Sequence, residues 1–161
     1  MPAVIDAQAL QRGTHPNTST AAAIRFTHEE TGWERVARLE ASTIHSLRVA
    51  SVEGPRFTAE IVAKVQPVDV RELVRLLSES LQRQHRLVTA DGMRRVSGQR
   101  VSSYRFAHQL MQSYLYRQLD EAEASYLHED VGLALEALFG AESNEIAVQL
   151  ARHFDLAGLP D

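Results

Sequence analysis

The stretch that decides the fold is Arg86–Phe106, "RLVTADGMRRVSGQRVSSYRF", where the helical spacing of apolar residues stops. It holds two turn-forming pairs, Asp91-Gly92 and Ser97-Gly98, and two short runs of β-type residues, "LVTA" and "VSSYRF". We therefore predict two antiparallel strands joined by a basic loop. A two-stranded hairpin is only marginally stable alone. We expect it to pack on the preceding helix through four apolar side chains, Leu87, Val88, Tyr104 and Phe106.

Three helices are predicted before this hairpin. The first has apolar residues at intervals of three and four from about Trp33 and ends at Gly54-Pro55, because glycine suits a helix C-cap and proline cannot continue the helix. The second lies in "FTAEIVAKVQ", with Thr58 as its N-cap and Pro67 as its stop. The third begins at Asp69, has Glu72 at the capping-box spacing and runs to about His85.

Helices are predicted again after the hairpin. Each of the three has an apolar stripe at helical spacing. The second is capped by Asp120 and ends at Gly140, and the third ends at Gly158. The three stripes are Leu110, Met111, Tyr114, Leu115 and Leu119; Leu127, Val131, Leu135 and Leu138; and Ile146, Ala147, Leu150, Ala151 and Phe154.

Three helices followed by a β-hairpin form the winged-helix arrangement. We predict a mainly α-helical fold with three parts. Residues 1–31 are polar and poorly patterned and are predicted to be a linker or poorly ordered entry. Residues 32–118 form a winged-helix domain, and residues 119–161 form a helical extension that begins as a helical hairpin.

The composition of the 161 residues is that of a soluble globular protein, with 44% hydrophobic and 24% charged residues. The absence of cysteine excludes a disulfide-stapled fold and a thiolate zinc site. No apolar run approaches the ~18 residues of a membrane span, and there is no signal-peptide pattern. We expect a cytoplasmic protein with no membrane contact.

Charge is distributed unevenly along the chain. Six arginines and one acid lie between Arg83 and Arg105, whereas ten acids and one arginine lie from Asp120 to the end. The net charge of −4 therefore combines a basic middle with an acidic tail.

No catalytic constellation is visible in the sequence. The glycines do not form GxxxxGK[ST] or GxGxxG, and neither GxSxG nor HExxH occurs. The seven histidines contain no pair at i,i+4, so we expect no metal site. The acids near Asp120 and Glu129 have the positions of helix caps and dipole partners. We predict that this chain is not an enzyme and holds no cofactor by itself.

Two alternatives follow from the charges. In one, the chain is a stand-alone winged-helix DNA-binding protein whose wing arginines Arg94, Arg95 and Arg100 touch the phosphate backbone. The mixed charges of the third helix and the acidic tail weigh against this alternative, so nucleic acid is not the partner we expect. In the other, the chain is a helical protein-interaction domain whose acidic helices dock a basic partner.

Four segments, in order, resemble a known family. They are "VASVEGPRF" (Val49–Phe57), "LQRQHRLV" (Leu81–Val88), "YRFAHQLMQSYLY" (Tyr104–Tyr116) and "AVQLARHFDLAG" (Ala147–Gly158). Residues 33–158 resemble the winged-helix region that follows the nucleotide-binding domain in STAND-class, NB-ARC-like signalling ATPases. These are large bacterial regulators, often coupled to cyclase or transcription-activator domains, with tetratricopeptide (TPR) repeats downstream.

The resemblance implies a non-catalytic regulatory segment of a signal-transduction ATPase. Such a segment relays nucleotide state from an NTPase domain, absent from this chain, to downstream helical repeats. Residues 119–161 would be the start of a TPR-like region. Partners would be the NTPase domain and the repeats of the same polypeptide, and ADP or ATP would bind only when that domain is present.

The resemblance also assigns a role to His108. In the related apoptosome and plant resistance ATPases, a histidine opens the last helix of the winged-helix domain in a Met-His-Asp or Leu-His-Asp triplet and reaches the β-phosphate of ADP. His108 matches that histidine and is the nucleotide-sensing candidate, but Ala107 and Gln109 flank it, so the acid of the triplet is absent. From the residues alone, a histidine at a helix start can bind an anion or simply cap the helix.

The last predicted helix should lack its stacking partner, because a repeat cannot bury its apolar face alone. We therefore expect an exposed patch around Ile146, Leu150 and Phe154, with self-association as its consequence. His153 is expected to line a helix–helix seam, with Leu150 and Phe154 as core.

Overall fold

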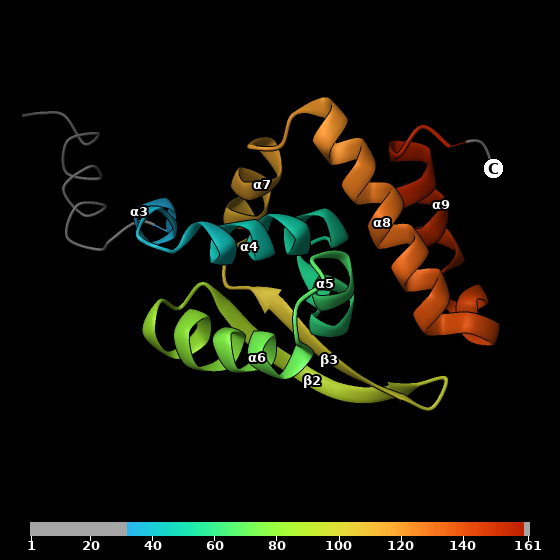
Figure 1. Ribbon diagram of the computed structural model, residues 1–161, viewed down its shortest axis with the longest axis horizontal. Helices are drawn as coiled ribbons and strands as arrows, with labels where there is room; N and C mark the ends of the chain where they lie inside the picture. The colour runs from blue at the N-terminus through green and yellow to red at the C-terminus, as the bar shows by residue number, and fades with distance from the viewer. Residues whose placement is uncertain (1–31, 160–161) are drawn as a thin grey trace, which may run out of the picture.

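The structure, a computed structural model, describes residues 32–159; the linker predicted for residues 1–31 lies outside them. The described part is mainly helical and carries a small antiparallel sheet with strand order β1-β3-β2. The elements are α3 (Gly32–Ala37), α4 (Ala41–Glu53), β1 (Arg56–Thr58), α5 (Ala59–Val65), α6 (Val70–Arg75), η1 (Leu76–Gln84), β2 (Val88–Val96), β3 (Gln99–Phe106), α7 (Gln109–Arg117), α8 (Glu121–Phe139), η2 (Gly140–Ile146) and α9 (Ala147–Leu156) (Figure 1).

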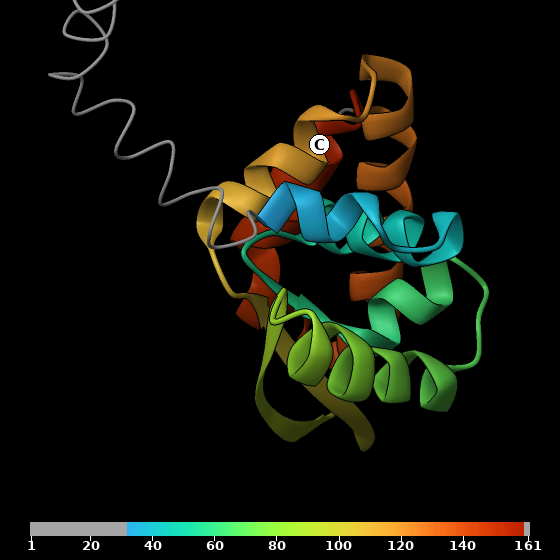
Figure 2. The ribbon, with the colours of Figure 1, turned by 90° about the vertical axis from the view of Figure 1, so that its left-hand side faces the viewer.

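Helix α4 crosses the middle of the molecule, with α6 and η1 on one side and α7 and α8 on the other (Figures 1 and 2). Helices α8 and α9 pack side by side, and α8 also packs on α4 and α5. The core includes Leu47, Phe57, Leu81, Leu115 and Leu135, each nearly or fully inaccessible to solvent. Burying a side chain of this size contributes about 2 kcal/mol.

The single helix predicted from Trp33 to Gly54 is in fact two helices, so that prediction was wrong. Helix α3 closes with backbone bonds from the amides of Arg38 and Leu39, and Glu40 then takes an extended conformation before α4 starts. Apolar residues keep their helical spacing across this break. The spacing therefore does not reveal that α3 and α4 are separate helices. Gly54 ends α4 as predicted, with a φ of 139°.

A short strand, β1, was not predicted. It pairs with β3, and Phe57 lies opposite Tyr104. The ring of Phe57 stacks on that of Tyr104, with centroids 5.9 Å apart, and lies tilted against that of Phe106, with centroids 5.1 Å apart. The second helix therefore begins at Ala59, after Thr58 in the N-cap position.

The predicted hairpin is present, but its turn was partly misplaced. Strand β2 continues through Asp91-Gly92, where the register shifts in a bulge, and the chain reverses at Ser97-Gly98. As a result Arg94 and Arg95 lie in β2 and Arg100 lies in β3, rather than in a basic loop.

The predicted packing of the hairpin on the third helix is confirmed. Leu87, Val88, Tyr104 and Phe106 are all buried, and the Tyr104 hydroxyl lies 3.0 Å from Ser78 Oγ of η1. Asp69 caps α6 by accepting from the amides of Arg71 and Glu72. Beyond Leu76 the helix widens into π-helical geometry, which the apolar spacing does not reveal. π-Helical segments are rare and often lie at functional sites.

The last helices follow the prediction with two corrections. Asp120 caps α8 by accepting from the Glu123 amide at 2.8 Å, and Gly140 ends it with a φ of 51°. Leu110, predicted to face the core, is 72% exposed, because Met111 and Leu115 occupy the side of α7 that packs inward.

The exposed patch predicted at Ile146, Leu150 and Phe154 is the second correction. Leu150 is buried, and Ile146 and Phe154 are partly buried against the core. Gly132 of α8 makes room for the Phe154 ring, which would come within 2.7 Å of a Cβ at that position. Helix α8 therefore supplies the cover that a further repeat was expected to supply.

Across residues 32–159, none of the helices is both long and apolar enough to cross a membrane.

Candidate functional site

His108 lies at the seam between β3 and α7, in the N-cap position of α7. Its backbone is extended, with φ −135° and ψ 134°, and its carbonyl accepts from the Met111 amide. The imidazole is exposed and makes no capping hydrogen bond to α7. The ring is therefore not committed to closing the helix.

A pocket of about 690 Å³ opens beside His108. It lies where α3, the end of η1, the start of β2 and the start of α7 meet. Among the residues that the structure describes, its lining is Arg35, Gln82, Arg86, Val88, Thr89, Ala107 and His108. Among these described residues there are two arginines and a histidine but no carboxylate, so the pocket favours an anion.

Arg35 reaches this pocket from α3. One of its terminal nitrogens, Nη1, donates to the carbonyl of His85 at 2.8 Å, which ties α3 to the end of η1. Its Nε is buried and has no hydrogen-bond partner, the one such side-chain nitrogen or oxygen within residues 32–159. A buried donor left unpaired costs about 1–3 kcal/mol.

Arg86 lies just beyond His85, the C-cap of η1, and has a φ of 54°, in the left-handed region that favours glycine. Here the chain leaves the helix for β2: the Leu87 amide bonds to the Leu81 carbonyl, and the Ala107 amide bonds to the Leu87 carbonyl. The second bond sets Ala107 and His108 beside the end of η1. The sequence pointed to His108, but it gave no signal for Arg35 or Arg86 at this site.

The wing arginines lie elsewhere. Arg94 stacks over the Phe139 ring at 5.5 Å, and Arg95 donates to the Gly98 carbonyl at 3.2 Å. Arg100 lies directly opposite Arg95 in the sheet. The structure does not bring these three arginines to the His108 pocket.

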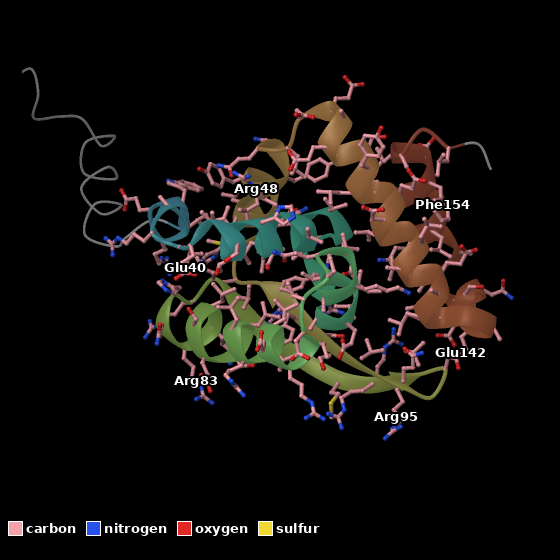
Figure 3. The ribbon with its side chains drawn as sticks, in the orientation of Figure 1. Glu40, Arg48, Arg83, Arg95, Glu142 and Phe154 are labelled. Carbon is pink, nitrogen blue, oxygen red and sulfur yellow. The ribbon has the colours of Figure 1, made fainter. Side chains whose placement is uncertain are left out.

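The wing tip is held against the helical extension. Ser97 Oγ donates to the Phe139 carbonyl at 2.6 Å, and the Ser97 amide donates to Glu142 at 3.1 Å. Figure 3 labels Glu142 near the tip of the hairpin. These bonds connect the hairpin to the C-terminal end of α8 and to η2.

A second cluster of titratable side chains lies between α7, α8 and α9. His128 Nδ1 lies 2.9 Å from His153 Nδ1, and His128 Nε2 lies 2.8 Å from the Tyr116 hydroxyl. Both histidines are buried, which confirms the predicted position of His153 in a helix–helix seam. His128 was missed, although it shares the buried side of α8 with Val131 and Leu135, at spacings of three and seven.

The environment lowers the pKa of both histidines. Burial lowers the pKa of His153 to about 4, with smaller contributions from His128 and Arg152. Burial and then Arg152 lower the pKa of His128. Facing Nδ1 atoms need one N–H and one lone pair, so one proton fits between them and a second is repelled. The pair is therefore neutral near pH 7.

A buried carboxyl, Glu53, forms a third feature that the sequence did not reveal. It accepts from the Thr58 amide and from the Thr58 hydroxyl, both at 2.8 Å. Burial raises the pKa of Glu53 to about 7, although the two bonds from Thr58 act in the opposite direction. This contact joins the end of α4 to the start of α5.

No group of three or more metal-ligating side chains occurs within the part of the chain that the structure describes.

Comparison of the chain with known protein families, curated proteins and solved structures found no match.

Proposed function

We propose that this chain is a winged-helix regulatory segment of a STAND-type signalling ATPase, in which His108 senses the phosphates of a bound nucleotide. The segment itself catalyses nothing. It passes the nucleotide state of an NTPase domain to helical repeats, of which α8 and α9 are the beginning.

The observation that carries the proposal is the position of His108. Its imidazole makes no capping bond and lines a pocket that also contains two arginines and, within residues 32–159, no carboxylate. An amide-rich helix start and cationic side chains together favour a phosphate group. This setting supports anion binding better than a purely capping role for His108.

The order of elements supports the winged-helix assignment. A helix, a short strand, two helices and a hairpin follow one another, and the hairpin packs on the helix before it. The contacts of α8 with α4 and α5, together with the bonds of Ser97 to the end of α8, join the pocket-bearing part to the helical extension. A ligand that binds one arrangement better than the other can bias such a connected switch.

The proposal is tested first in the coding sequence. An in-frame GxxxxGK[ST] loop upstream is expected; an upstream frame without an NTPase domain would contradict the relay.

The second test is His108→Leu in the full-length protein. The variant should lose ADP retention and show a larger activated fraction, because the sensor no longer favours the ADP state. Gln109→Leu is the matched control, since it changes the neighbouring exposed position, which does not line the pocket. Equal ADP retention and activation in wild type and His108→Leu would refute the role of His108.

A further inference from the structure

We propose that Arg35 and Arg86 are the principal ligands of a phosphate-binding site that is complete within this chain, with His108 as its third donor. The ligand class is a terminal phosphate or diphosphate. This inference deepens the proposed function and rests on it only for the expectation that the phosphate belongs to a nucleotide.

The first observation that favours this phosphate site is the unpaired Nε of Arg35. The guanidinium is oriented on one side by its bond to the His85 carbonyl, while the buried Nε–H has no acceptor. Buried donors are nearly always paired in folded proteins. Arg35 also lines the pocket, so a small turn of its side chain would bring this donor to a phosphate oxygen there, and the charge-assisted bond would be stronger than one to a neutral acceptor.

The second observation is the backbone conformation of Arg86, which has a positive φ. A positive φ is costly for a side chain other than glycine, asparagine or aspartate. Glycine would relieve this strain at the end of η1, yet the chain carries an arginine there, and that arginine lines the pocket. Strained backbone tends to cluster at binding sites, and a cationic ligand for an anion is a physical reason to keep arginine at this position.

The remaining lining groups fit an anion. The side-chain oxygen of Gln82 already accepts from the Ala90 amide at 2.7 Å, which leaves its NH2 group as a donor. Thr89 adds a hydroxyl, and Val88 and Ala107 add apolar walls that limit hydration. Because these described side chains present donors and no carboxylate, a cationic ligand is disfavoured.

The site draws on separate parts of the chain. Arg35 comes from α3, Arg86 from the turn that follows η1, and His108 from the N-cap position of α7. Arg35 bonds to the residue just before Arg86, so occupation of the pocket would brace α3 against η1.

The test is a titration of the 161-residue chain with pyrophosphate at two salt concentrations. Binding is measured by calorimetry and by changes in the amide chemical shifts. We expect saturable binding that weakens with salt, with shifts concentrated at Arg35, Arg86 and His108. Arg86→Gly should weaken binding by at least about tenfold, because it removes a charge-assisted contact. It should not lower thermal stability, because glycine tolerates the local φ.

Arg83→Ala is the matched control. It removes one positive charge from the same helix end, but Arg83 projects outward in Figure 3 and does not line the pocket. Its affinity for pyrophosphate should stay within about twofold of wild type, as expected for a screened surface charge. Arg35→Lys keeps the charge but loses the planar fork and should weaken binding as Arg86→Gly does.

Absence of saturable binding, or equal losses in Arg86→Gly and Arg83→Ala, would overturn the inference. The relay could still hold in that case, with phosphate ligands supplied by the NTPase domain. Conversely, pyrophosphate binding that depends on Arg86, combined with a full-length His108→Leu protein that behaves as wild type, would support the anion site and refute the sensor role of His108.

Discussion

Two regions of the molecule bury titratable side chains, and they respond to pH in opposite directions. At the α4–β1–α5 junction, Glu53 is held by the amide and hydroxyl of Thr58. At the α7–α8–α9 seam, the facing Nδ1 atoms of His128 and His153 have one proton between them. In both regions burial favours the neutral form, which means protonated for the carboxyl and deprotonated for the imidazoles.

The comparison shows that a flat stability profile can conceal two opposed titrations. Because the pKa of Glu53 rises from 4.5 to about 7 on folding, its contribution to stability is present below pH 4.5 and is lost as pH rises through about 7. Because the pKa of His153 falls from 6.5 to about 4, its contribution is present above pH 6.5 and is lost as pH falls through about 4. Between pH 4.5 and 6.5 the two slopes oppose each other.

The largest expected effect is that of Glu53→Gln. The amide oxygen can accept from the Thr58 amide and the NH2 group can donate to the Thr58 hydroxyl, so both contacts survive without a charge. The free energy of unfolding at pH 8 should rise by about 3 kcal/mol, while at pH 4 it should match wild type. Urea unfolding at both pH values measures the difference.

Glu60→Gln is the control for this variant. Glu60 carries a similar pair of bonds, to the amide and hydroxyl of Ser102, but is not fully buried. The charge of Glu60 is the smaller of the two causes that raise the pKa of Glu53, so the control should gain a little stability at pH 8. A gain as large as that of Glu53→Gln would show that burial of Glu53 is not the main cause.

The next effect isolates the histidine seam. In the Glu53→Gln background, stability should fall by about 2 to 3 kcal/mol as the pH is lowered from 6.5 to 4.5, because the unfolded chain binds a proton that the native seam rejects. Adding His153→Gln should remove most of this pH dependence. The part of the slope that remains is then due to His128. An unchanged slope in the double variant would place the titration elsewhere.

The smallest effect concerns packing at the same seam. Gly132→Ala puts a Cβ 2.7 Å from the Phe154 ring, so the ring or one of the two helices must shift. We expect a loss of about 2 kcal/mol, the cost of overpacking a core, measured by thermal unfolding. Phe154→Leu in the same chain should recover much of it. A stabilising Gly132→Ala, as expected for a free helix position, would mean that α8 and α9 are not in close contact.

Sequence reasoning worked where a local signal was enough. The caps at Asp69 and Asp120, the hairpin and its apolar contact face follow from residue types at fixed short spacings. The break at Glu40, the strand β1 and the bulge at Gly92 leave the apolar spacing nearly unchanged, so they were missed or misplaced.

The candidate site was only partly predictable for a related reason. His108 could be singled out because it opens a helix, but Arg35 and Arg86 meet it only through tertiary contacts. The predicted open patch at Ile146, Leu150 and Phe154 failed because a periodic face does not tell which neighbour covers it. The histidine seam also depends on packing, since its two residues are 25 positions apart.

The hydrogen bonds between Ser97 and the end of α8 have a mechanical consequence. Nine residues of extended chain in β2 span about 30 Å, from the pocket edge at Val88 to the wing tip. The near end is fixed beside η1 and the far end is bonded to Phe139 and Glu142. The hairpin is therefore a strut held at both ends, and it connects the pocket edge to the C-terminal end of α8. A displacement of β2 at the pocket would therefore reach the end of α8 through the hydrogen bonds of Ser97.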